Sequence, residues 1–147
     1  DHIEEYYSIL LSTYSRLGND RIPSMNFFKQ CVKTLAPRQM LKMFLVKKDS
    51  KFVAGGLFLI FNRKIIFWRG ATLSEYLKFG SSNLLYWHTI RWAVENDYKS
   101  YDTLHSPTQQ LSDFKRGFGC VEKKSYRAVK KSKLMSLGSI FKKQLPI

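Results

Sequence analysis

The chain has 147 residues, of which 44% are hydrophobic and 15% aromatic, and its formal net charge is +14. This length fits one domain with a real core and is short for two. The longest apolar run, over residues 53–61, falls far short of the roughly 20 residues that span a bilayer, so no transmembrane helix is expected. The first residues do not have the pattern of a signal peptide, and we expect a cytoplasmic location.

Two helices are expected at the start of the chain. Apolar residues between Ile3 and Leu17 recur at the i, i+3, i+4, i+7 spacing of an amphipathic helix, which Gly18 ends. Ser24 is a suitable N-cap for a second helix, whose apolar stripe stops before Pro37. The sequence therefore predicts a helical pair ahead of any strand.

Three strands are expected next, as an antiparallel meander. Residues 41–47, 51–61 and 64–71 are rich in β-branched and aromatic side chains, and short turn sequences separate them. Gly55 and Gly56 interrupt the middle strand. Two glycines inside a strand indicate a bulge or the close approach of another element.

The second half of the chain predicts helices alternating with short strands. A loop over residues 76–82 leads into a helix over 83–95 that is apolar almost all round, which predicts burial on more than one side. A short strand at Tyr101, another helix and a final strand over about 120–129 complete the order ααβββαβαβ. This order predicts an α/β domain.

The helix after Tyr101 has clear start and stop signals. Ser106 is the expected N-cap, Pro107 suits the first helical position, and Gln109 stands where the partner of a capping box would be. Gly117 is expected to end the helix in the left-handed conformation. This strand, capped helix and glycine stop form the clearest local signature of the chain.

The motif Phe-Lys-x-x-Phe-Gly at residues 114–119, after a strand that ends in Tyr101-Asp102, resembles the GNAT-like acyltransferase domain of the Fem family. These are the peptidoglycan bridge-forming aminoacyltransferases, with relatives among cellulose-biosynthesis-protein-like acetyltransferases. The resemblance implies a GNAT fold, with a mixed and mostly antiparallel sheet flanked by helices, over a single domain at residues 1–130. Because Fem-like proteins carry two such lobes, it also implies that this chain is a C-terminal lobe.

The resemblance further implies a donor site at the turn into the apolar helix. In GNAT enzymes this turn offers backbone N–H groups and a helix dipole to the pyrophosphate of an acyl-CoA. Here it contains Lys78, Gly80, Ser81 and Ser82, but Leu77 stands where the Gln/Arg-x-x-Gly-x-Gly/Ala pattern has Gln or Arg. Acyl-CoA and aminoacyl-tRNA are both candidate co-substrates, no tightly bound cofactor is expected, and an ordinary helix cap is the alternative.

Acyl transfer needs an unprotonated amine, a polarised carbonyl and a group that protonates the leaving group. The strand backbone at residues 68–70 is a candidate for holding the carbonyl, Asp102 for accepting a proton and Tyr126 for donating one. For each of these residues, a purely structural role is the alternative to a catalytic one. Many GNAT enzymes use a tyrosine near the last helix as a general acid, and here Phe114 and Phe118 occupy that region.

In the Fem family a lysine of the second lobe helps to hold the acceptor phosphates, and the resemblance nominates Lys115, with Arg116 beside it. The alternative is that both are ordinary cations at a helix C-terminus. Cys31 and Cys120 are far apart and the histidines are scattered, so no metal site is predicted.

Residues 131–147 have the pattern of a basic amphipathic helix or tail. This segment has three alternative roles: it contacts an anionic membrane, it contacts RNA, or it packs on the domain. Taken together, these features predict an N-acyltransferase or aminoacyltransferase that acts on a small-molecule or peptide amine. The alternative is a non-catalytic GNAT-like lobe that binds an anionic ligand, tRNA or a partner lobe.

Overall fold

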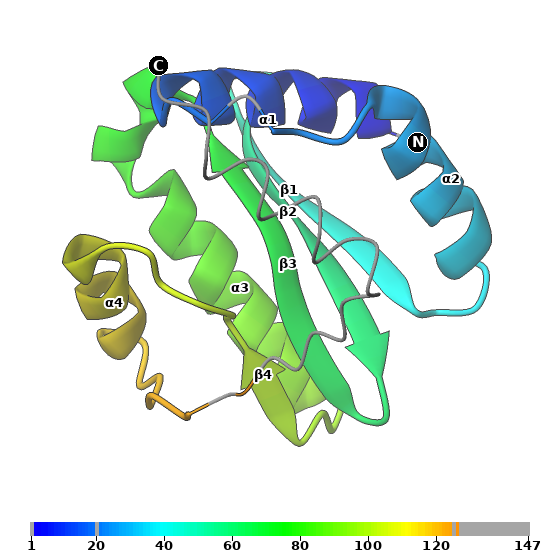
Figure 1. Ribbon diagram of the computed structural model, residues 1–147, viewed down its shortest axis with the longest axis vertical. Helices are drawn as coiled ribbons and strands as arrows, with labels where there is room; N and C mark the ends of the chain where they lie inside the picture. The colour runs from blue at the N-terminus through cyan, green and yellow to red at the C-terminus, as the bar shows by residue number, and fades with distance from the viewer. Residues whose placement is uncertain (1, 20, 125, 127–147) are drawn as a thin grey trace, which may run out of the picture.

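The computed structural model of the chain describes residues 2–19, 21–124 and 126, and it contains a sheet with helices on both faces (Figure 1). The predicted tail at 131–147 lies outside the described residues. None of the described helices is long and apolar enough to cross a membrane. In chain order the elements are α1 (Ile3–Arg16), α2 (Met25–Leu35), β1 (Leu41–Lys48), β2 (Lys51–Phe61), β3 (Lys64–Thr72), the 3-10 helix η1 (Ser74–Phe79), α3 (Ser81–Glu95), β4 (Ser100–Asp102) and α4 (Gln109–Arg116).

The sheet is mixed, with the strand order β1-β2-β3-β4, which confirms the predicted meander. The turns at Asp49-Ser50 and Asn62-Arg63 have positive φ at both central residues, the conformation whose twist suits a two-residue hairpin. β4 pairs parallel with β3, because α3 carries the chain back across the sheet between them. The two strands pair only from Lys64 opposite Ser100 to Ile66 opposite Asp102.

Alternate residues of the strands supply the two halves of the core. Leu57 packs beneath α1 and α2 with Tyr6, Leu10 and Phe28, while its neighbour Phe58 faces α3 and α4. Burying an aliphatic or aromatic side chain of this size stabilises the fold by about 1.5–3 kcal/mol. Figure 1 shows α1 crossing one end of the sheet, where the loop between β3 and α3 also lies.

A β-bulge in β3 changes the direction of its side chains. Phe58 pairs with Phe67 but Leu57 pairs with Arg69, which leaves Trp68 as the extra residue. The glycines of β2 were predicted to mark a bulge or a close approach, and the close approach is confirmed. A Cβ atom on Gly55 would lie 2.6 Å from the Leu45 side chain, and one on Gly56 would lie 2.7 Å from the Phe67 ring.

The predicted end of α4 at Gly117 is confirmed, but its predicted N-cap and the predicted conformation of Gly117 are wrong. Its N-cap is Thr108, whose Oγ1 accepts a hydrogen bond from the N–H of Leu111 at 3.3 Å, and not Ser106. Gly117 is right-handed at the C-cap, and Gly119 adopts the left-handed conformation instead, with φ of 78°. The side chain of Gln109 reaches forward to Asp113 rather than back toward a cap.

Two further expectations about the second half are wrong. α3 is buried on the side that faces the sheet, while Leu84, Trp87 and Val94 on its outer side are 56%, 58% and 73% exposed. Nothing in the described part of the chain covers that outer side, and apolar composition alone could not reveal this. Residues 120–124 form no strand, and the rest of the predicted final strand falls largely outside the described residues.

Candidate functional site

The N-terminus of α3 has no side-chain cap within the described residues. Gly80 is its N-cap, with the left-handed φ of 69° that favours glycine, and it provides no side-chain cap. Within the described residues, the N–H groups of Ser81, Ser82 and Asn83 donate no hydrogen bond. The first turn also has no acidic side chain. Free N–H groups and the helix dipole therefore favour a negatively charged group here.

The serine hydroxyls at this turn hold the loop in place. Ser81 Oγ donates to the carbonyl of Tyr76 at 3.2 Å, and Ser82 Oγ lies 2.9 Å from Thr72 Oγ1. Lys78 lies over the ring of Phe79, with its Nζ 5.2 Å from the ring centre. The structure thus brings Lys78, Gly80, Ser81 and Ser82 to one place, as one short segment before and at the start of α3.

A polar network ties the end of β3 to α1. Thr13 Oγ1 donates to the carbonyl of Thr72 at 3.1 Å and accepts from its N–H at 3.0 Å. Arg16 Nη1 donates to the same carbonyl at 3.2 Å and to Ser74 Oγ at 2.7 Å. Because Thr72 also contacts Ser82, this network connects α1 to the first turn of α3.

Beyond Ile66, the edge of β3 that faces β4 has no paired strand within the described part of the chain. The bulge at Trp68 lies in this unpaired stretch. The stretch includes the backbone of residues 68–70, which the sequence indicated as a candidate for holding the carbonyl. Tyr6 Oη donates to the carbonyl of Arg69 at 3.0 Å and fixes the strand from the α1 side. An unpaired strand edge offers backbone N–H groups to a ligand.

Asp102 lies at the end of β4, where the two strands part. Its carboxylate pairs with Lys64 Nζ at 2.7 Å and accepts a hydrogen bond from the N–H of Leu104 at 2.8 Å. The hydrogen bond from Lys64 lowers the pKa of Asp102, and that from Leu104 acts in the same direction. The carboxylate is therefore ionised at neutral pH and can accept a proton, although these contacts reduce its basicity.

Lys115 is 5% exposed and holds the loop after β4. Its Nζ donates to the carbonyls of Thr103, Leu104 and His105 at 2.7, 3.1 and 3.2 Å. An ammonium group has three donors, so these carbonyls use all of them. Burial lowers the pKa of Lys115. Its role in holding an acceptor stays a prediction, and the geometry also gives it a structural role.

The remaining nominated residues lie apart from this loop. Arg116 Nη2 pairs with Asp113 at 2.6 Å on the exposed side of α4. Tyr126 is 91% exposed beyond α4. Asp102 and Lys115 contact the N–H and the carbonyl of the same residue, Leu104, whereas no contact within the described residues connects Tyr126 to them.

Three side chains of the site were missed from the sequence, those of Thr13, Thr72 and Arg69, although the backbone of Arg69 was a candidate. Thr13 and Thr72 meet only because α1 crosses the end of β3, and no local pattern encodes that crossing. Arg69 had a visible signal, since it is a charged residue inside an otherwise apolar strand. Its surroundings depend on the bulge at Trp68, which shifts the alternation that a strand pattern assumes.

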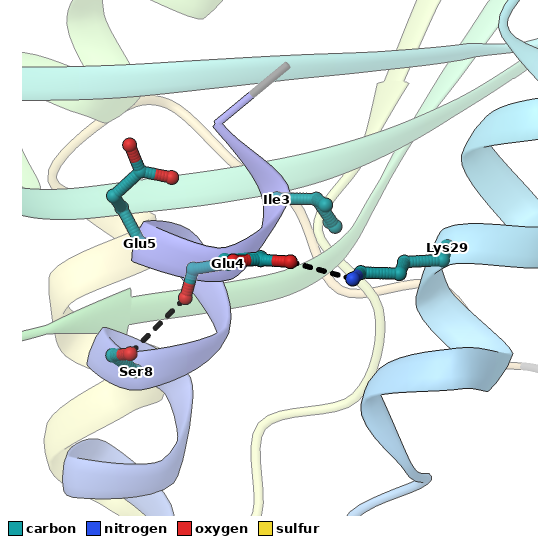
Figure 2. A pocket seen from close by; sticks show the side chains of 5 residues that line it. All are labelled: Ile3, Glu4, Glu5, Ser8 and Lys29. Carbon is teal, nitrogen blue, oxygen red and sulfur yellow. Dashed lines mark hydrogen bonds and ion pairs between the residues drawn. The ribbon is translucent and has the colours of Figure 1, made fainter.

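A hollow on the molecule lies elsewhere, between α1 and α2 (Figure 2). Figure 2 shows the ion pair between Glu4 and Lys29, at 2.5 Å, spanning it. Ser8 Oγ donates to the carbonyl of Glu4 at its side, and Ile3 and Glu5 complete the lining. None of the predicted site residues lines this hollow.

Several solved structures of acetyltransferases share this fold. An aminoglycoside acetyltransferase, meta-AAC0020 from an uncultured soil metagenomic sample, was solved with sisomicin and matches with a TM-score of 0.68 at 12% identity, over 89% of this chain and 90% of that one. AAC(6')-Iy in complex with the bisubstrate analog CoA-S-monomethyl-acetylneamine matches with a TM-score of 0.69 at 13% identity, over 89% and 92%.

The ribosomal-protein-S18-alanine N-acetyltransferase from Escherichia coli matches with a TM-score of 0.65 at 13% identity, over 80% of this chain and 70% of that one. A comparison with curated protein sequences finds no match. The family model described as the Acetyltransferase (GNAT) domain matches residues 6–116, from the first turns of α1 to the end of α4. The predicted GNAT fold is therefore confirmed, and the chain belongs to the GNAT acetyltransferase domain family.

Proposed function

We propose that the protein is an N-acetyltransferase that transfers the acetyl group of acetyl-CoA to the amine of a small molecule or peptide. The observation that carries this proposal is the open N-terminus of α3, with a glycine cap and free N–H groups, at the end of β3 in a GNAT fold. A structural neighbour was solved with a CoA-containing bisubstrate analog, which supports the choice of donor.

In this proposal the pyrophosphate of CoA binds the N–H groups of Ser81, Ser82 and Asn83, and Lys78 adds positive charge. The helix dipole and N–H groups favour such an anion without a dedicated side chain. The acyl chain then extends along the open edge of β3. There the backbone at 68–70 polarises the thioester carbonyl by hydrogen bonding.

The chemistry is a direct attack of the acceptor amine on the thioester carbon. The C–N bond forms, the C–S bond breaks, and CoA leaves as its thiolate, which takes up a proton. The attacking amine must lose one proton, and we assign its acceptance to Asp102, acting directly or through water. The sequence nominates Tyr126 as the proton donor to the thiolate, but within the described residues it is 91% exposed and has no contact with this site, so we assign the proton to water.

The test is release of free thiol from acetyl-CoA in the presence of a panel of primary amines. The proposal predicts thiol release that depends on both the amine and the protein, together with an acetylated amine detected by mass spectrometry. Binding of CoA without any amine-dependent release would instead support the non-catalytic lobe. Absence of CoA binding would remove the donor assignment.

Aminoacyl transfer from aminoacyl-tRNA, as in the Fem family, is the second candidate. It is favoured by Leu77, which is 47% exposed at the position where the acyl-CoA pattern has Gln or Arg. The exposed outer side of α3 would suit a second lobe in such a protein. Transfer of a radiolabelled amino acid from charged tRNA, with no thiol release from acetyl-CoA, would select this candidate.

A further inference from the structure

Two arginines lie along the contact between α1 and β3, and both bond to neutral oxygens. Arg69 Nη1 donates to Tyr14 Oη at 2.6 Å, and its guanidinium carbon lies 5.6 Å from the centre of the Tyr14 ring. Arg16 bonds to the Thr72 carbonyl and the Ser74 hydroxyl. Neither arginine forms an ion pair with a carboxylate among the residues that the structure describes. Positive charge on this side of β3 is thus not neutralised.

The Nε atom of Arg69 is the feature that points to a ligand. It is buried and has no hydrogen-bond partner within the described part of the chain, whereas buried donors in folded proteins are almost always paired. Tyr14 uses Nη1, which leaves Nε and Nη2 uncommitted. These two donors form one side of the guanidinium fork, whose geometry matches two oxygens of a carboxylate or a phosphate.

Arg69 is also placed beside the proposed chemistry. It directly follows the bulge at Trp68, and its own backbone belongs to the stretch proposed to hold the thioester carbonyl. A group bound by its side chain would therefore be held on the α1 side of that stretch, near the attacking amine. Holding the acceptor in this way would contribute to catalysis by orientation.

We propose that the acceptor is an amine that also carries an oxyanion, either a carboxylate or a phosphate, which Arg69 binds while Tyr14 positions the guanidinium. This inference rests on the proposed acetyl transfer and adds the class of acceptor. An unneutralised guanidinium beside the reacting amine repels a polycation. The acceptor would therefore differ in charge from sisomicin, the aminoglycoside bound to one structural neighbour.

The experiment compares amines that differ only in the oxyanion. Binding of L-phenylalanine and phenethylamine, and of O-phosphoethanolamine and ethanolamine, is measured by calorimetry on the full chain, and kcat/KM is measured for the same compounds. At least one oxyanion-bearing amine is expected to bind about tenfold or more tightly than its partner, as a charge-assisted hydrogen bond allows. The two pairs distinguish carboxylate from phosphate recognition.

Variants assign the preference to this site. Arg69→Met is expected to remove most of the preference and Arg69→Lys to restore part of it, because lysine keeps the charge but not the fork. Tyr14→Phe is expected to reduce the preference less. Arg91→Met is the matched control, since it removes the same charge from the exposed pair with Glu95 on α3. Thermal unfolding of each variant verifies that it is folded.

Equal binding within both pairs, tighter binding of sisomicin than of either oxyanion-bearing amine, or an unchanged preference in Arg69→Met would each overturn the inference. CoA affinity is measured in the same preparations. Its absence would count against the acetyl-CoA donor, whereas the binding preference for an oxyanion does not depend on CoA. The two proposals can therefore fail separately.

Discussion

Replacing Asn83 by aspartate should weaken CoA binding while stabilising the fold. Asn83 is exposed in the first turn of α3, where its N–H group is free within the described residues. A carboxylate at this position would interact with the N–H groups and the helix dipole itself, which typically contributes 0.3–1 kcal/mol. It would also place a negative charge beside the proposed pyrophosphate.

The size of the effect follows from Coulomb's law. At a separation of about 6 Å, a pair of unit charges interacts by ~0.7 kcal/mol in water and by ~3 kcal/mol at the effective dielectric constant of a protein surface. Each charge on the pyrophosphate adds a term of this kind. The variant should therefore bind CoA at least several-fold, and up to about a hundredfold, more weakly at low salt.

The assay pairs calorimetric titration with CoA and thermal unfolding of the free protein. Asn96→Asp is the matched control, because it makes the same chemical change at the C-terminal end of α3. That control should lose stability, since Asn96 Nδ2 donates to the Trp92 carbonyl and a negative charge is unfavourable there. Its CoA affinity should not change. Equal CoA affinity in Asn83→Asp and the unaltered protein would refute the reasoning.

Three further substitutions test the supports of the site. Lys115→Met should lower the free energy of unfolding by about 1–3 kcal/mol in a denaturant titration, because the carbonyls of residues 103–105 lose their hydrogen bonds to the Lys115 ammonium group; unchanged stability would favour a pure ligand-binding role. Asp102→Asn should reduce the dependence of the free energy of unfolding on pH in the acid range, measured by denaturant titrations at several pH values. The lowered pKa of Asp102 means that its contribution is present above the unfolded value of 3.8 and is lost as the pH falls through the folded value, so an unaltered profile would contradict the pairing with Lys64. Thr72→Val should weaken CoA binding several-fold by releasing Ser82, and unchanged affinity would show that this contact does not position the loop.

Features fixed by neighbouring residues could be predicted from the sequence. Ser24 accepts a hydrogen bond from the N–H of Phe27, and both hairpin turns of the meander lie where turn residues were found. The order of α-helices and strands through α4 also followed from periodicity, whereas the 3-10 helix η1 was predicted to be a loop. Such signals are local, so their physics is contained in a short stretch of chain.

Features set by distant contacts could not be predicted. Thr108 rather than Ser106 caps α4, although both residue types suit a cap. The loop just before this helix is held by Lys115, which donates to the carbonyls of residues 103–105. The outer side of α3 is exposed because the described helices and strands cover only one of its sides, and composition gave no sign of this. Arg69 acquires its environment from α1 and the bulge in β3.

The most direct test of acetyl-CoA binding is a titration of the isotopically labelled chain with CoA, followed by the backbone amide signals in NMR spectra. The proposal predicts saturable shifts for the amides of Ser81, Ser82 and Asn83 and for those near the bulge at Trp68. It also predicts no shift at the hollow around Glu4 and Lys29. Unchanged amide signals at the start of α3 at millimolar CoA would contradict the proposed donor site.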